Sequence, residues 1–247
     1  YHAIGGRSSE SMDVCHRLGG VYPHGKHPQE SSRQGLAAGG MALPSGWLGQ
    51  ADNFLGIDEP WCHPDQAGVY VLPAPYEHTS SYILGSDRGP SAIIEASQQV
   101  ELYDETLRYE PYREWGGVAT AATLNLDGRV DGPAVQAIQD FVQPHVGRGK
   151  FLVTLTGEHT GALGAIRAHA RNYPGMCVVQ IDAHGDLRQA YQDNPYSHAS
   201  VMARVVEDGL PLVQIGVRSI SPEEIDLIQK TPRIHTFFAA SILDPSG

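Results

Sequence analysis

The stretch FLVTLTGEHTGALGAIRAHARNYPGMCVVQID, residues 151–182, contains two apolar runs separated by a helical pattern. The runs FLVTLT (151–156) and CVVQID (177–182) are short and nearly continuous, and residues 160–173 between them are predicted to be helical. Strands that are apolar throughout are buried on both faces, which is typical of parallel sheets covered by helices. The stretch therefore predicts a strand–helix–strand unit of an α/β fold.

The same alternation extends in both directions along the chain. Strands are predicted at 68–73, 211–219 and 234–241, and helices at 89–104, 132–146, 197–209 and 221–231. Short connections between these elements indicate a three-layer α/β/α sandwich with a mainly parallel sheet. In such sheets ligands bind beyond the carboxyl ends of the strands.

Residues 1–52 differ from the rest of the chain. They are rich in Gly, Ser, Gln and His and show no sustained hydrophobic periodicity. Such a stretch buries too little apolar surface to offset the entropy of ordering it. We expect a low-complexity, disordered extension over 1–52 and one α/β domain over 53–247.

Composition narrows the partners and the compartment. The formal net charge is −11 and no Lys/Arg cluster stands out, which disfavours nucleic acid and anionic membranes as partners. No apolar run approaches the roughly 18–20 residues that cross a bilayer. The three cysteines are widely spaced and do not form a disulfide framework, so we expect a cytoplasmic protein.

Ionisable residues follow two consecutive predicted strands. His159 comes after FLVTLT, and Asp182, His184 and Asp186 come directly after CVVQI. If the strands run parallel, these four side chains meet at one edge of the sheet. Two imidazoles with carboxylates suit Mn, Fe, Zn or Ni better than Ca or Mg.

Each of these residues or motifs, taken alone, also has a simpler structural interpretation. His159 alone could be structural, Glu158 could be an acid favoured by the start of a helix, and D-A-H-G-D (182–186) could be a solvated turn. Four such residues at two neighbouring strand ends favour a ligand cluster. His198 follows closely in the chain and could fold over the mouth of the site.

The motifs resemble those of the ureohydrolase family, which contains the arginases, agmatinases and their relatives. TGEHT (156–160) is similar to the Gly-Gly-[Asp/Glu]-His-Ser motif, with Thr at its first and last positions, and residues 182–186 match Asp-Ala-His-x-Asp in full. Residues 73–105 resemble the agmatinase N-terminal signature. The resemblance covers about 54–240 and within the family is strongest to bacterial and archaeal agmatinases.

The resemblance implies the arginase/deacetylase-like fold and a di-manganese hydrolase. His159 and Asp186 would bind one Mn²⁺, His184 the other, and Asp182 would bridge them. In this family a hydroxide shared by the two ions attacks a guanidino carbon and urea is released, as when agmatine becomes putrescine. His198 would move protons or steady the substrate. A small cationic guanidino substrate and a homo-oligomer, a trimer or hexamer, are also implied.

One family motif is not matched. The family's third motif, Ser-x-Asp-x-Asp-x-x-Asp-Pro, supplies two further aspartate ligands, but after Asp226 the only carboxylate side chain is Asp244. From this we expect the chain to stop short of the third motif. With four ligands instead of six, we expect this chain to hold one Mn²⁺ or none and to be inactive or impaired.

Two alternatives to agmatine hydrolysis stay open at the level of sequence. One is the same chemistry on guanidinobutyrate, formiminoglutamate, arginine or guanidine. The other is a non-catalytic relative that keeps the fold and binds one metal or a partner subunit. The number of metal ions bound per chain distinguishes an enzyme from a scaffold.

Overall fold

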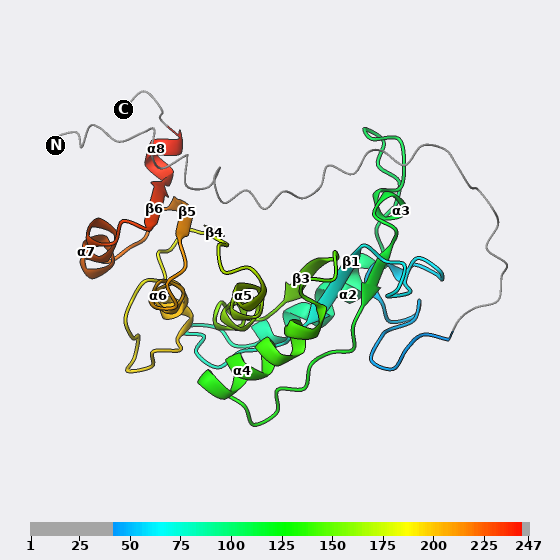
Figure 1. Ribbon diagram of the computed structural model, residues 1–247, viewed down its shortest axis with the longest axis horizontal. Coiled ribbons are helices and arrows are strands. Elements are labelled where there is room, and N and C mark those ends of the chain that lie inside the picture. The colour runs from blue at the N-terminus through cyan, green and yellow to red at the C-terminus, as the bar shows by residue number, and fades with distance from the viewer. Residues whose placement is uncertain (1–41, 244–247) are drawn as a thin grey trace.

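The computed structural model describes residues 42–243 and shows two parallel three-stranded sheets with helices packed on them (Figure 1). The first sheet has the order β2-β1-β3 and the second the order β4-β5-β6, and every pairing is parallel. The strands are β1 Val69–Pro73, β2 Val118–Thr120, β3 Phe151–Leu155, β4 Val178–Ile181, β5 Leu212–Val217 and β6 Ile234–Phe238. The predicted α/β class with parallel strands is confirmed.

Helices follow most strands, as the alternation predicts. They are α2 Gly89–Ser97, α3 Pro111–Glu114, α4 Asp131–Val142, α5 Thr160–Asn172, α6 Val201–Glu207, α7 Pro222–Lys230 and α8 Ala239–Leu243. Short 3-10 turns are η1 Phe54–Gly56, η2 Ser86–Arg88, η3 Gln143–His145 and η4 His198–Ser200. None of the helices in the described part of the chain is both long enough and apolar enough to cross a membrane.

Three clusters of buried side chains hold these layers together. Tyr70 and Leu72 of β1 point into a cluster with Ile138 of α4, while Val71 between them points into a second cluster on the opposite face. β1, the central strand of the first sheet, is therefore buried on both faces, as expected for apolar strands, whereas Phe151 of β3 is 56% exposed. A third cluster joins Leu163 of α5 to α6 and the second sheet.

The second sheet departs from the expectation of burial on both faces. Val179 and Ile181 of β4 are 55% and 82% exposed, and Phe237 of β6 is 55% exposed. These side chains alternate with the buried Val178 and Gln180, so the exposed ones share one face. Within residues 42–243 that face of β4 is open.

Some predicted boundaries also shift. The helix predicted over 89–104 ends at Ser97, whose hydroxyl donates to the carbonyl of Ile94 and accepts from Leu55 N. Residues 239–241, predicted as the end of a strand, begin α8 instead. β2 was not predicted, because three residues are too few to show a pattern.

The first residues described fall in the stretch expected to be disordered. Trp47 stacks edge-on against Tyr70 at a ring distance of 4.6 Å, and Leu48 N donates to Thr120 O at 2.9 Å. Residues 42–52 therefore contact the domain that we predicted to begin at 53. The expectations for residues 1–41 and for Asp244 lie outside the described residues.

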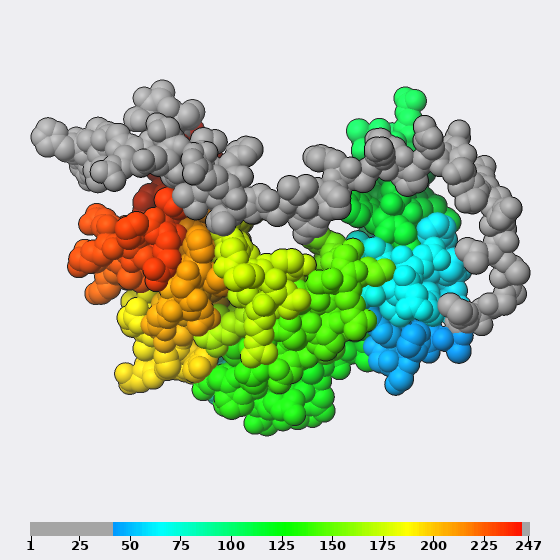
Figure 2. All heavy atoms as spheres, in the orientation of Figure 1, coloured from blue at the N-terminus to red at the C-terminus, as the bar shows by residue number. Residues whose placement is uncertain are grey.

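The predicted site residues fall in the middle of the molecule. In Figure 2 the chain around residues 151–190 separates the N-terminal part of the described fold from its C-terminal part. β3 belongs to the first sheet, and β4 opens the second. Side chains that follow β3 and β4 can therefore meet between the two sheets.

Candidate metal centre

The turn between β3 and α5 places His159. Gly157 lies close to residues 74–88, which follow β1 and which we call the entrance loop. A Cβ at Gly157 would stand 2.5 Å from the carbonyl oxygen of Tyr76 and 2.8 Å from the nitrogen of Asp87. The backbone nitrogen of Glu158 donates to Tyr76 O at 2.9 Å. The turn is thus held by backbone contacts, and His159 projects from it at the start of α5.

The loop after β4 places Asp182 and Asp186. Asp186 has a positive φ of 52°, which is uncommon for a residue other than glycine. Its carbonyl accepts from Met202 N at 2.9 Å and Ala203 N at 3.2 Å, and Leu187 N donates to the buried Glu224 at 2.9 Å. These contacts with α6 and α7 fix the loop in a conformation that turns Asp186 back toward Asp182.

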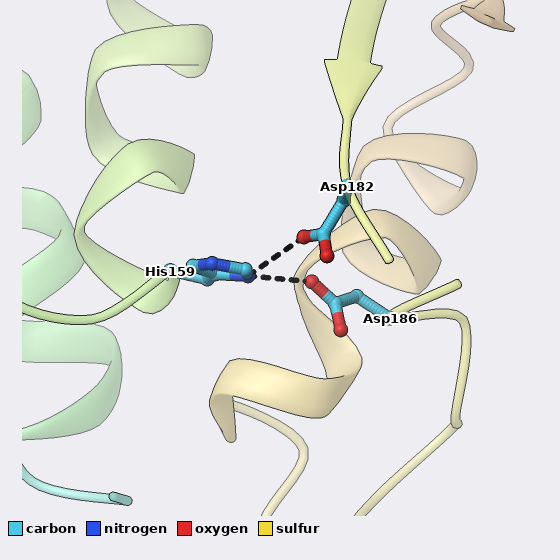
Figure 3. Close-up of side chains that lie close together, drawn as sticks. All are labelled: His159, Asp182 and Asp186. Carbon is cyan, nitrogen blue, oxygen red and sulfur yellow. Dashed lines mark hydrogen bonds and ion pairs between the residues drawn. The ribbon is translucent and has the colours of Figure 1, made fainter. Parts of the chain in front are cut away.

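Three of the predicted ligands meet (Figure 3). His159 Nδ1 lies 2.7 Å from Asp186 Oδ2 and 3.4 Å from Asp182 Oδ2. One candidate ligand atom from each residue lies within 4.8 Å of the other two. The imidazole comes from the first sheet's side and both carboxylates from the second, so the group spans the two sheets.

His184 stands on the other side of Asp182. Its Nδ1 lies 3.4 Å from Asp182 Oδ1, and its side chain is 61% exposed. Asp182 therefore turns one oxygen toward His159 and the other toward His184. His184 lies outside the three-residue group, so the structure brings three predicted ligands together and sets the fourth beside them.

A buried pair of amides behind the carboxylates was not predicted. Gln180 Nε2 donates to Asp182 Oδ2 and to Asp186 Oδ2, each at 3.2 Å. Gln214, its partner across the β4–β5 pairing, donates to Gln180 Oε1 at 2.6 Å and accepts from Thr236 Oγ1 of β6 at 2.9 Å. A signal was present: a glutamine inside an apolar strand must find hydrogen bonds. These amides orient both carboxylates.

Charge and hydrogen bonds shift two pKa values in the group. The hydrogen bond with Asp186 raises the pKa of His159, helped by the charges of Asp186, Asp182 and Glu158 and opposed by partial burial. Burial acts to raise the pKa of Asp182, but the hydrogen bond from His184 N and the charge of His159 outweigh it and lower that pKa. Both shifts favour a charged pair where no cation is bound.

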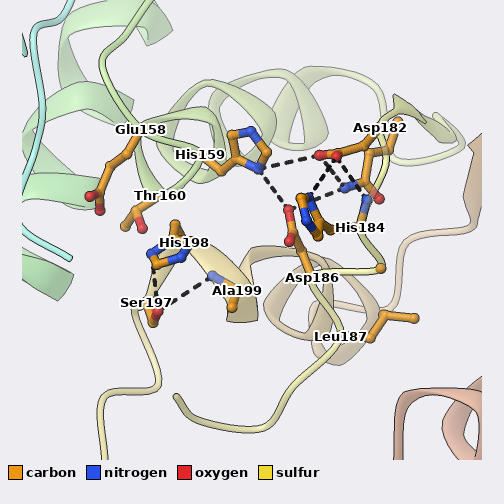
Figure 4. Close-up of polar contacts among 12 residues, drawn as sticks. Glu158, His159, Thr160, Asp182, His184, Asp186, Leu187, Ser197, His198 and Ala199 are labelled. Atoms are coloured by element: carbon orange, nitrogen blue, oxygen red, sulfur yellow. Dashed lines mark hydrogen bonds and ion pairs between the residues drawn. The ribbon is translucent and has the colours of Figure 1, made fainter. Parts of the chain in front are cut away.

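His198 lies across a cavity from the metal-ligand group. The cavity has a volume of about 550 Å³, and its lining includes His159, His184, Asp186, His198 and the rim residue Tyr82. Figure 4 shows His198 and Ser197 on one side of the site and Asp182, His184 and Asp186 on the other. The structure places His198 in the wall of this cavity, and its folding over the mouth stays a prediction.

Hydrogen bonds to Glu158 connect the entrance loop to the wall of the cavity. Its Oε2 accepts from His78 N at 3.2 Å and Thr79 N at 2.8 Å, and Thr79 Oγ1 lies 2.7 Å from its Oε1. The interpretation of Glu158 as an acid favoured by a helix start misses these contacts, because its partners lie about 80 residues earlier in the chain. No local pattern in the sequence marks them.

The donor set fits a transition-metal ion. One imidazole nitrogen and two nearly buried carboxylates converge, with a second imidazole adjacent, and such mixed N/O sets suit Mn, Fe or Zn. Within the described residues, the two carboxylates contact the imidazoles of His159 and His184, the amide of Gln180 and the backbone N–H of His184. A divalent cation would compensate their charge.

Comparisons with known proteins point the same way. The model of the arginase family matches residues 67–244. The N(1)-aminopropylagmatine ureohydrolase of Synechocystis sp. is 43% identical over 72% of this chain, and an agmatinase of Bacillus anthracis is 30% identical over 66% of it. An arginase structure from Medicago truncatula superposes with a TM-score of 0.62 at 26% identity, covering 72% of this chain and 58% of that one.

The matched relatives are longer than this chain. The match covers 59% of the Synechocystis protein and 57% of the Bacillus anthracis protein. The chain thus spans less than two thirds of the length of these relatives.

Proposed function

Because this chain belongs to the arginase family, we propose that it is a ureohydrolase that cleaves the guanidino group of a small cationic amine into urea and an amine. The observation that carries the proposal is the convergence of His159, Asp182 and Asp186 in a cavity that His198 also lines. Hydrolysis of a guanidino carbon needs an activated water and a group that handles protons, and this cavity has residues for both.

We propose the following parts for the site residues. His159 and Asp186 would hold one metal ion, His184 would hold a second, and Asp182, which turns one oxygen toward each imidazole, would contribute to both. Bound Mn²⁺ supplies Lewis acidity that lowers the pKa of water. Asp182 and Asp186 also favour the approach of a cation, and His198 on the opposite wall exchanges protons with the substrate nitrogens.

The relatives suggest the substrate class. One relative is named for N(1)-aminopropylagmatine and another for agmatine, and both molecules carry a guanidino group on an alkyl amine. The side chains of Tyr82 and Ile83 at the rim are 91% and 71% exposed, and they offer apolar surface to an alkyl chain. We therefore propose a guanidino-alkylamine substrate, which includes agmatine.

A second candidate is a substrate with a carboxylate, such as arginine or guanidinobutyrate. The observation in its favour is Arg188, which lines the cavity and lies 5.7 Å from the ring of Tyr191. A guanidinium there can bind a carboxylate. Competition between the two classes in one assay decides between them.

The test is urea release by the purified chain with Mn²⁺ and agmatine, N(1)-aminopropylagmatine, arginine or guanidinobutyrate. We expect metal-dependent urea from an alkylamine substrate, lost in Asp182→Asn. A chain that binds Mn²⁺ but releases no urea from any of these compounds would overturn the proposal and favour a metal-binding scaffold.

Two further expectations belong with this proposal. A trimer or hexamer is expected from the family resemblance, and size-exclusion chromatography with light scattering measures it. A cytoplasmic location is expected from the cysteine usage, and fractionation of cells that express the protein tests it.

A further inference from the structure

The hydroxyl of Thr79 has three polar neighbours, and together they use all its hydrogen-bonding capacity. Its oxygen lies 2.7 Å from Glu158 Oε1, 2.9 Å from the backbone nitrogen of His198 and 3.1 Å from His198 Nδ1. A hydroxyl donates one hydrogen bond and accepts two. The direction of each contact can therefore be assigned.

The assignment starts from the two groups that can only accept or only donate a hydrogen bond. A carboxylate only accepts, so the Thr79 hydroxyl donates to Glu158. The backbone N–H of His198 only donates, so Thr79 accepts it. The hydroxyl then has one lone pair left for His198 Nδ1, and that contact is favourable only if Nδ1 carries the proton.

We call the contacts that run from Glu158 through the Thr79 hydroxyl to His198 the relay. Glu158, at its start, is held in place by hydrogen bonds. Glu158 is 6% exposed and accepts through Oε2 from His78 N and Thr79 N. Its position fixes the loop that carries Thr79. One competing contact exists: Ser197 Oγ lies 3.4 Å from His198 Nδ1 and could donate to it. That distance is long for a hydrogen bond donated by a hydroxyl.

We propose that Glu158 and Thr79 fix neutral His198 in the tautomer with the proton on Nδ1, which leaves Nε2 as an acceptor. Within the described residues Nε2 has no hydrogen-bond partner, and the residue lines the cavity. His198 then meets a substrate as a proton acceptor. Thr79 and Glu158 are positioning residues, and their catalytic meaning rests on the proposed function of His198.

The test is the ¹⁵N NMR spectrum of the histidine ring nitrogens in the metal-free chain. The spectrum is recorded at a pH at which the two His198 ring nitrogens give the separate signals of a neutral imidazole, so that they report the tautomer. The His198 signals are those lost in His198→Gln. We expect Nδ1 to be protonated, the pattern to persist in Thr79→Ser, and Thr79→Val to give a mixture of tautomers.

Two outcomes would overturn the proposal. One is protonated Nε2 in the unsubstituted chain, and the other is an unchanged spectrum in Thr79→Val. If Thr79→Val disturbs the fold, Ser197→Ala provides the independent measurement. It should leave the tautomer unchanged, and a switch would show that Ser197 rather than Thr79 sets it.

This outcome is separable from that of the proposed function. The spectrum needs neither metal nor turnover, so it reports the relay alone. If the chain releases no urea but His198 Nδ1 is protonated, the proposed relay stands and the proposed hydrolase function fails. If the chain releases urea but His198 Nε2 is protonated, the proposed hydrolase function stands and the proposed relay fails.

Discussion

At the residue scale, Gln180 links the sheet to the metal ligands. Its amide nitrogen contacts one oxygen of Asp182 and one of Asp186, and Gln214 fixes the amide from behind. Both glutamines are at least nine-tenths buried. A buried amide whose partners are all satisfied holds its neighbours in one rotamer. Gln180 therefore sets the separation of the two carboxylates before a metal binds.

Replacing Gln180 by Met tests this function. The substitution preserves approximate size and removes the donor to both carboxylates. Partners behind metal ligands typically contribute about 10- to 100-fold to metal affinity, and we expect a loss in that range. Titration of the metal-free chain with Mn²⁺ by calorimetry measures it. Gln99→Met, at an exposed glutamine, is the matched control, and equal affinities in the two variants would contradict the expectation.

Glu77 gives a pH-dependent prediction. Hydrogen bonds from Ser80 and from Gly85 N, at 2.6 Å, lower the pKa of Glu77 from 4.5 to about 2. A lowered pKa stabilises the folded chain above the unfolded value and loses that effect as pH falls through the folded value. The stability difference between the unsubstituted chain and Glu77→Gln should be constant above about pH 5 and shrink toward pH 2.

Chemical denaturation at a series of pH values measures that difference. Glu105→Gln, at an exposed glutamate with no hydrogen bond to its side chain among the described contacts, is the control. A stability difference that grows as the pH falls would contradict the lowered pKa of Glu77.

The sequence identified ionisable residues more readily than their partners. Asp182, His184 and Asp186 form a motif that can be read directly, and His159 follows from the end of the previous strand. Thr79 could not be assigned, because its contact with Glu158 joins residues 79 positions apart. Such contacts depend on how loops meet in space, which hydrophobic periodicity does not encode.

At the element scale, the contact of α4 with α5 fixes the start of α5, where His159 lies. A Cβ at Gly164 would stand 2.6 Å from the carbonyl oxygen of Val135 and 2.7 Å from Ile138 Cβ. Glycine thus allows the two helices to approach closely. Any larger residue at this position must push α5 away from α4.

Gly164→Ala should therefore destabilise the fold despite alanine's better helix propensity. Overpacking of this kind costs about 1–3 kcal/mol, and we expect a loss of unfolding free energy in that range, measured by chemical denaturation. Gly49→Ala is the control, because Gly49 lies outside the helices and a Cβ there makes only an ordinary contact, 3.6 Å from Leu43 Cδ1. Its stability should be unchanged or up to about 1 kcal/mol higher. Equal losses in both variants would contradict the packing argument.

Most elements could be predicted, since period-2 and period-3.6 patterns extend over enough residues to be recognised. β5 and α7 fall within the predicted ranges 211–219 and 221–231, and a capping box of Ser221 and Glu224 marks the start of α7. The early end of α2 was missed, because it depends on Ser97 accepting from the distant Leu55. Tertiary contacts override helix propensity there.

At the scale of the whole molecule, the candidate metal centre joins the two sheets. His159 follows β3 of the first sheet, and Asp182 and Asp186 follow β4 of the second. β3 and β4 do not pair with each other among the described strands. A metal ion held by these three residues would therefore cross-link two parts of the fold that are otherwise joined by helix packing, above all through α5.

Metal should accordingly raise the thermal stability of the chain. At a free Mn²⁺ concentration 100 times the dissociation constant, binding to the native state alone adds about 2.7 kcal/mol. For a domain of this size that corresponds to a rise in Tm of about 5–10 °C, measured by calorimetry or circular dichroism. His159→Ala should lose the rise. A Tm that does not change with Mn²⁺ in the unsubstituted chain would contradict the cross-link.

The central claim is that His159, Asp182 and Asp186 bind a metal ion, and calorimetric titration of the metal-free chain with Mn²⁺ tests it most directly. We expect binding of at least one ion per chain, loss of binding in Asp182→Asn and Asp186→Asn, and unchanged binding in Asp226→Asn at an exposed aspartate on α7. Circular dichroism checks that each variant is folded. Equal Mn²⁺ affinity in all four proteins, or no binding by the unsubstituted chain, would contradict it.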